Sequence, residues 1–261
     1  MGRLVTFGIC LCVIVVAAVT NPPPKPSPPP YPPDTIVLTP TNHLAVVGTI
    51  DAASASAFVH AFQRHHASVR YVYIDSYGGS VAAGKRMVVE LKARNVTCVV
   101  ETAYSMAFVL VQACAHRLVR VSGSMMQHQI SIANLQGELG KVLSQVRDVE
   151  RRGRWLDRMQ ADRLNLTEQA FVARVANEWW LDAESALTHR CADAIAPFVA
   201  CHATLLAQTV KRTETSSFAS VATATIREFS ACPLVSEPIR TLAAASTGTT
   251  TTTTTTVSNI Y

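Results

Sequence analysis

Three short segments, in a fixed order, contain the residue types that a serine hydrolase uses. Residues 74–80 (IDSYGGS) contain a glycine pair, residues 103–107 (AYSMA) contain Ser105, and residues 125–128 (MMQH) end in His128. Such an enzyme needs backbone amides that stabilise an oxyanion, a serine nucleophile and a histidine that takes the serine proton. The three segments together therefore predict acyl-transfer chemistry.

Each segment also has an ordinary structural explanation. Gly78 and Gly79 follow a buried strand and could form a simple turn into a helix. Ser105 precedes an apolar helix, where serine is a favoured N-cap residue. His128 is one of 8 histidines in the chain. The chemical interpretation therefore depends on the order of the segments and on the elements that position them.

Strands and helices alternate along the centre of the chain. Runs of β-branched and aromatic residues predict the strands, and apolar residues at helical spacing predict the helices between them. This alternation is typical of parallel βαβ units and predicts an α/β fold. The expected strands cover residues 44–50, 69–74, 96–100, 117–121 and 124–129, and the expected helices cover residues 52–66, 80–94 and 105–114.

Further helices are expected in the second half of the domain. Apolar residues at helical spacing predict a long amphipathic helix over residues 134–162, although Gly137, Gly140 and Gly153 weaken it. Thr167 and Asp182 each precede a helical segment and are suited to cap it.

The ends of the chain differ from its centre in composition. Residues 1–20 contain an apolar run over 4–19, which predicts a signal peptide or a signal anchor and a secreted or membrane-anchored protein, extracytoplasmic or lumenal. Residues 21–33 form a proline-rich linker. Residues 34–198 form the expected folded domain, and residues 199–261 are an Ala-, Ser- and Thr-rich tail that is expected to be mostly disordered.

Composition excludes several classes of protein. Hydrophobic residues make up 49% of the chain and charged residues 16%, with a net charge of +5, which fits neither a disordered chain nor one that coats nucleic acid. The cysteines lack zinc-site spacing. Cys191 and Cys201 could form a disulfide in an oxidising compartment, whereas Cys98 and Cys114 are explained at least as well as buried thiols.

Taken together, the three segments resemble the proteolytic subunit of the Clp protease (ClpP), and in particular the phage and bacterial ClpP-like branch of the ClpP/crotonase superfamily. The resemblance covers roughly residues 37–195. A fourth segment, residues 178–186 (EWWLDAESA), resembles the part of the family that supplies the third member of the catalytic triad. The resemblance implies a ClpP/crotonase-like spiral of ββα units with a helical handle, which residues 134–162 would form.

The resemblance also implies a role for each residue of the first three segments. Ser105 would be the nucleophile and His128 the general base. The backbone amides of Gly79 and Met106 would form the oxyanion hole, with Gly78 shaping the turn.

The third member of the triad aligns with Glu178, where the family usually has aspartate. A glutamate can orient a histidine, but its extra methylene must be accommodated. Asn177 and Asp182 are alternative partners for His128, and Asp182 also suits a structural role as a helix N-cap.

The function expected from the resemblance is that of a serine endopeptidase that needs no metal or organic cofactor. Its partners would be peptide or protein substrates and further copies of itself in a ring, with no nucleic acid, and residues 4–19 could anchor it to a membrane. The family's gating region, which meets an ATP-dependent unfoldase, is replaced here by the leader and the proline tract. The sequence also lacks a Walker-type loop, so an unfoldase partner is not favoured.

Three alternatives remain open. The chain could be a catalytically weak or inactive ClpP-like scaffold, which the glutamate at position 178 favours and the intact Ser105 and His128 oppose. It could be a crotonase-like acyl-CoA enzyme, whose chemistry would not require this serine and histidine. A Ser-Lys dyad would need Lys85 or Lys141, and the resemblance places both poorly.

Overall fold

The computed structural model describes residues 35–65, 67–131, 137–218 and 221–247. The predicted leader, the proline-rich linker and residues 248–261 of the predicted tail lie outside these residues, so the predictions for them stay predictions. None of the described helices is both long and apolar enough to cross a membrane.

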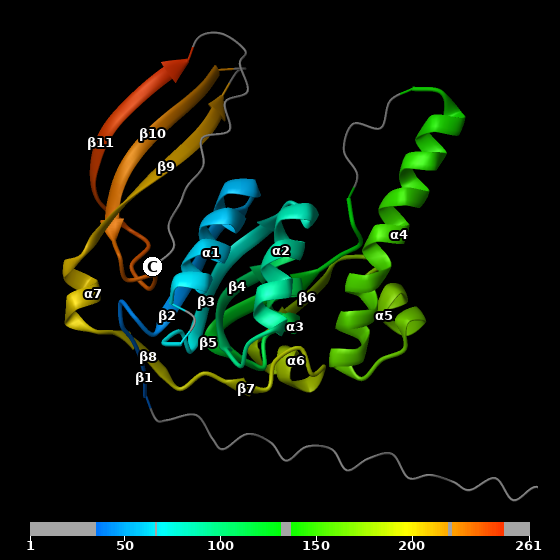
Figure 1. The fold of residues 1–261 in the computed structure, drawn as a ribbon, viewed down its shortest axis with the longest axis horizontal. Helices are drawn as coiled ribbons and strands as arrows, with labels where there is room; N and C mark the ends of the chain where they lie inside the picture. The colour runs from blue at the N-terminus through cyan, green and yellow to red at the C-terminus, as the bar shows by residue number, and fades with distance from the viewer. Residues whose placement is uncertain (1–34, 66, 132–136, 219–220, 248–261) are drawn as a thin grey trace, which may run out of the picture. The chain divides into compact units, whose positions relative to one another are not determined.

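The centre of the fold is a six-stranded sheet with the order β2-β3-β4-β5-β6, in which β7 also pairs with β5 (Figure 1). Strands β2 to β5 are parallel to one another, whereas β6 is antiparallel to β5. The predicted α/β fold of strand-and-helix units is therefore confirmed. The strands are β2 (His43–Ile50), β3 (Tyr71–Gly79), β4 (Thr97–Tyr104), β5 (His116–Gln127), β6 (Trp179–Asp182) and β7 (Ala194–Ile195).

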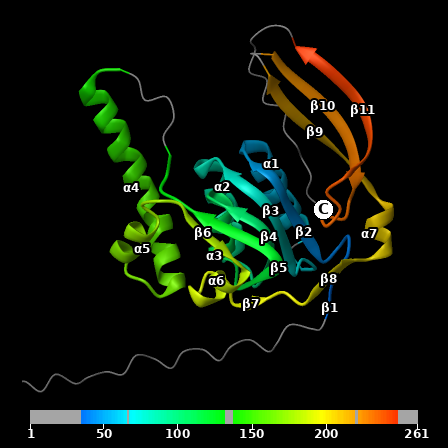
Figure 2. The ribbon, with the colours of Figure 1, turned by 180° about the vertical axis from the view of Figure 1, so that it is seen from behind.

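Three helices connect the parallel strands and pack against the sheet, as the view from behind also shows (Figure 2). Helix α1 (Ala52–Arg64) begins with a capping box between Asp51 and Ser54, and α2 (Val81–Lys92) begins at Ser80, whose hydroxyl accepts a hydrogen bond from the Ala83 amide. All residues of α3 (Met106–Ala113) are buried. A helix without a polar face must lie inside the protein, and α3 accordingly forms part of the main hydrophobic core.

The long helix α4 (Leu139–Leu164) corresponds to the predicted handle. It begins later than predicted, because Gly137 has a φ of +123°, which a helix does not allow. It ends at Asn165, whose left-handed φ of 59° forms a C-cap. The predicted N-caps of α5 (Glu168–Arg174) and α6 (Ala183–Thr188) are confirmed, because the side chains of Thr167 and Asp182 each accept a backbone hydrogen bond.

The chain after residue 198 differs from the disordered tail that its composition predicts. Buried apolar residues explain the order, because Val210, Phe229 and Cys232 join a second core cluster with Ile36 and Tyr73. Threonine also favours strands, so its abundance does not by itself indicate disorder. This part comprises β8 (Phe198–Cys201), then α7 (Ala203–Ala207) and a three-stranded antiparallel sheet of β9 (Thr209–Phe218), β10 (Val221–Ser230) and β11 (Pro238–Thr247). Strand β8 pairs in parallel with β1 (Thr35–Leu38), the first strand of the described chain.

The described residues contain two disulfides, and one of them overturns the interpretation of Cys98 and Cys114 as buried free thiols. Cys98 pairs with Cys114, and Cys201 pairs with Cys232. The suggested Cys191–Cys201 bridge is therefore wrong, since Cys191 is a buried free thiol. Burial raises the pKa of Cys191 to about 12, so this side chain stays a neutral thiol near pH 7.

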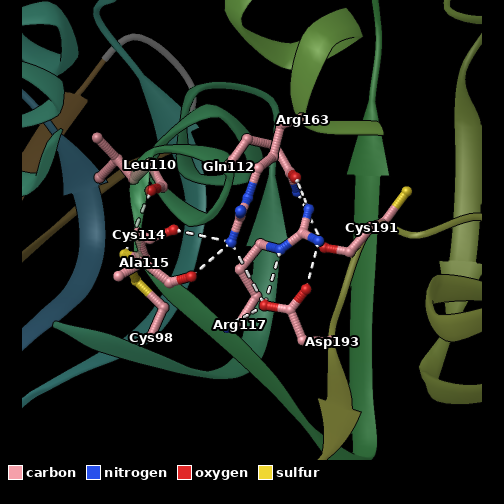
Figure 3. The surroundings of a disulfide bond; sticks show 9 residues. All are labelled: Cys98, Leu110, Gln112, Cys114, Ala115, Arg117, Arg163, Cys191 and Asp193. Atoms are coloured by element: carbon pink, nitrogen blue, oxygen red, sulfur yellow. Dashed lines mark hydrogen bonds and ion pairs between the residues drawn. A yellow bond between two sulfur atoms is a disulfide. The ribbon is translucent and has the colours of Figure 1, made fainter. Parts of the chain in front are cut away.

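A buried arginine joins the elements around the Cys98–Cys114 disulfide (Figure 3). Arg117, only 3% exposed, donates to Asp193 at 2.6 Å and to Gln112 at 2.5 Å. Arg163, near the end of α4, donates to the carbonyl oxygen of Ala115 at 2.6 Å. These contacts hold the ends of α3 and α4 to the start of β5.

Removing the carboxylate of Asp193 should destabilise the fold, because it leaves the buried guanidinium of Arg117 without this counter-ion. Burial raises the pKa of Asp193, but the hydrogen bonds and charge of Arg117 outweigh it, so the pKa is lowered. The pair therefore stabilises the fold fully above the unfolded pKa of about 4 and loses this effect as the pH falls through the folded pKa. We expect Asp193→Ala to lower the free energy of unfolding by about 3 kcal/mol at pH 7, with a smaller difference at pH 3, as measured by urea denaturation.

The matched control is Arg151→Ala, which removes the surface ion pair with Asp148. It should cost less than about 1 kcal/mol. Equal losses in the two variants would contradict the structural role assigned to the Arg117–Asp193 pair.

Candidate active site

Ser105 occupies the sharp turn between β4 and α3. Its φ of 54° and ψ of −118° lie outside the helical and strand regions, and its side chain makes no capping hydrogen bond to α3. Its backbone amide donates to the carbonyl oxygen of Met126 at 2.8 Å. The side chain is therefore not used as an N-cap, and the strained backbone is of the kind found where a nucleophile is presented from a strand-to-helix turn.

His128 lies beside Ser105 because their strands are neighbours. Strands β4 and β5 run parallel, and their register pairs Tyr104 with Met126, so the residues that follow both strands meet at one edge of the sheet. The distance from His128 Nε2 to Ser105 Oγ is 2.9 Å. This is the hydrogen bond that a histidine needs to take a proton from a serine hydroxyl.

The glycine pair lies directly behind the serine turn. Gly78 has a φ of +91°, and a Cβ added there would lie 2.6 Å from the Tyr104 carbonyl oxygen and 2.8 Å from the Met106 nitrogen. Gly79, with a φ of +146°, approaches the backbone of Ile50 just as closely. Only glycine fits both positions without a shift of the neighbouring backbone.

Met106 supplies a backbone amide next to this glycine pair. It is the first residue of α3, so its N–H has no acceptor within the helix. The positive end of the helix dipole adds to the attraction for an anion at this point. The turn of Gly78 and Gly79 against Met106 can therefore stabilise negative charge that develops on an oxygen bound beside Ser105.

The hydrogen-bond partner of Glu178 is not the histidine that the resemblance implies. The carboxylate of Glu178 is exposed and accepts a hydrogen bond from the indole nitrogen of Trp180 at 3.0 Å. Within the residues that the structure describes, no hydrogen bond joins Glu178 to His128. Of the alternative partners, Asp182 caps α6, and no described hydrogen bond joins Asn177 to His128.

The packing of Trp180 explains the position of the Glu178 carboxylate. The Trp180 ring packs edge-on against Tyr104 at 5.0 Å between ring centroids, and Tyr104 packs in the same way against Tyr77 at 5.3 Å. The Tyr104 hydroxyl is further held by Ser124 at 2.7 Å. This aromatic row fixes Trp180, whose indole N–H then holds the carboxylate of Glu178.

A cavity of about 210 Å³ contains Ser105 and His128. The long helix α4 contributes one of its walls, a contribution that the sequence segments did not reveal because α4 carries no motif for it. A larger hollow of about 380 Å³ contains neither of these residues. The cavity residues other than Ser105 and His128 are Gly79, Ser80, Val81, Met106, Val109, Gln127, Gln129, Ile130, Ser131, Leu156, Asp157 and Gln160.

The comparison with known proteins agrees with this geometry. The profile of the Clp protease family matches residues 37–197, and the chain belongs to that family. Membership of this family suggests a serine peptidase. A search of curated proteins gave no match.

The contact between the glycine turn and the nucleophile turn can be tested with Gly78→Ala. The added Cβ would collide with backbone atoms of residues 104–106, so we expect a loss of stability of about 1–3 kcal/mol and at least about tenfold slower reaction of Ser105 with a fluorophosphonate.

The control is Gly140→Ala in α4, where an added Cβ meets no atom within 4 Å. This change should be neutral or should stabilise the helix by about 0.5–1 kcal/mol. A Gly78→Ala variant that reacts as fast as the wild type would contradict the proposed role of the turn.

Proposed function

We propose that this protein is a serine endopeptidase that hydrolyses peptide bonds through an acyl-enzyme on Ser105. The observation that carries the proposal is the 2.9 Å contact between Ser105 Oγ and His128 Nε2, made at a turn where the serine side chain caps no helix. Membership of the Clp protease family supports the same conclusion.

The reaction follows from the arrangement of these groups. His128 Nε2 accepts the hydroxyl proton of Ser105 as Oγ attacks the carbonyl carbon of the scissile peptide bond. The amides of Gly79 and Met106 stabilise the resulting oxyanion, while Gly78 maintains the turn. His128 then gives the proton to the leaving amine, and a water molecule, activated by the same histidine, hydrolyses the ester.

We propose that the Ser105–His128 pair provides most of the rate enhancement. Glu178 is the residue that the family resemblance aligns with the third triad member, but its carboxylate binds Trp180. It therefore contributes less than a buried carboxylate bound to the far nitrogen of the histidine would.

We further propose that the enzyme works as a homo-oligomer outside the cytosol. Exposed apolar residues of α4, Leu139, Leu143 and Trp155, suit an interface with other copies of the chain, which agrees with the oligomers typical of the family. The two disulfides fit an oxidising compartment. This location matches the leader predicted over residues 1–20.

Hydrolysis of a fluorogenic peptide by the purified full-length chain tests the proposed reaction. Ser105→Ala and His128→Ala should each lower kcat by about 10⁴-fold or more, because the nucleophile and its base act as one unit. Lys85→Ala, which lies outside the cavity, is the control. A Ser105→Ala variant with wild-type activity would show that Ser105 is not the nucleophile, whereas a correctly folded but inactive wild type would favour the scaffold alternative.

The contribution of Glu178 is tested separately by Glu178→Gln. Because Glu178 binds Trp180 instead of His128, we expect kcat to fall by less than about tenfold, whereas loss of a true orienting carboxylate costs about 10⁴-fold. Steady-state kinetics on the same peptide measure this change in kcat. A loss near the larger value would show that Glu178 reaches His128 during catalysis.

A further inference from the structure

The cavity beside Ser105 has an amphipathic lining. Val81, Val109 and Leu156 line it with apolar side chains, and α4 adds the acidic residue Asp157. Such a lining suits a side chain that has an apolar stem and a polar end.

The carboxylate of Asp157 lacks a counter-ion in the described part of the chain. The side chain is half-buried, and no described residue forms a hydrogen bond or an ion pair with it. Burial raises the pKa of Asp157, and the nearby carboxylate of Glu168 raises it further. Glu168 itself pairs with Arg158 at 2.8 Å, so that arginine is already engaged.

The neighbouring amides are also engaged. Gln127 and Gln160 are 4% and 1% exposed, and the Nε2 of Gln127 donates to the Oε1 of Gln160. The Nε2 of Gln160 donates to the Leu156 carbonyl at 3.1 Å, and the Oε1 of Gln127 accepts from the His128 amide at 3.1 Å. These bonds fix the polar side of the cavity and leave Asp157 as its unpaired charge among the described residues.

We infer that this cavity selects substrates with arginine or lysine at the residue whose carbonyl Ser105 attacks, and that Asp157 pairs with the cationic end of that side chain. The inference rests on the proposed peptidase function. The methylene stem would pack on Val81, Val109 and Leu156, and the cation would offset the cost of burying a lone carboxylate. Asp157 is thus a specificity-determining residue, and it takes no part in the bond-making steps.

Matched peptidyl-coumarin substrates that differ only at this residue test the inference. Citrulline is the control for arginine, because it keeps the shape and loses the charge. We expect the wild type to prefer arginine over citrulline in kcat/KM by about tenfold or more, and Asp157→Asn to reduce this ratio to below about threefold.

The matched control variant is Asp162→Asn, which changes another aspartate of α4 that lies outside the cavity. It should keep the wild-type ratio. A wild type that hydrolyses the two substrates equally, or an Asp157→Asn variant that keeps the preference, overturns the inference and leaves the peptidase proposal intact.

Binding to the Ser105→Ala variant separates this inference from the reaction itself. Calorimetry with two peptides, one ending in arginine and one ending in citrulline, should show tighter binding of the arginine peptide by about tenfold, with the difference lost when Asp157→Asn is added. If the wild type fails to hydrolyse any peptide but this difference is present, the peptidase proposal fails and the cation-selective cavity stands. If the two peptides bind equally, the inference is overturned whatever the enzyme does.

Discussion

The candidate site depends on one close contact between two backbone turns. Gly78 approaches the segment from Tyr104 to Met106 so closely that a single added carbon would lie within 3 Å of its atoms. This contact places the amide of Met106 beside the glycine turn, while Ser105 adopts a positive φ and directs its hydroxyl to His128. Changes that separate the two turns would therefore affect the nucleophile and the oxyanion site together.

The parallel sheet holds the two turns in contact. Strands β3, β4 and β5 are neighbours, and the glycine pair, the serine and the histidine each lie at or just after the end of one of them. The buried helix α3, which begins just after Ser105, packs in the main core. The arginine cluster around Arg117 holds the start of β5, the strand whose far end leads to His128. Positioning therefore comes from rigid elements, as preorganised catalysis requires.

Local sequence patterns predicted much of this arrangement. The glycine pair, Ser105 and His128 could be placed because the strand ends that carry them are marked by β-branched runs, and the neighbours of a parallel sheet share an edge. The same reasoning could not place Glu178, because its position depends on Trp180 packing against Tyr104, a contact between distant segments. Asp157 was missed for a similar reason, since only the path of α4 past the cavity makes that residue part of the site. In the C-terminal part, composition was misleading because it hid a second hydrophobic core that includes Val210 and Phe229.

The most direct test of the central claim is to trap the acyl-enzyme and locate it. The full-length protein would be treated with a peptidyl β-lactone, digested, and examined by mass spectrometry for the modified residue. We expect a single ester adduct on Ser105 that fails to form in His128→Ala. An adduct on another residue, or none on a folded and assembled wild type, would contradict it.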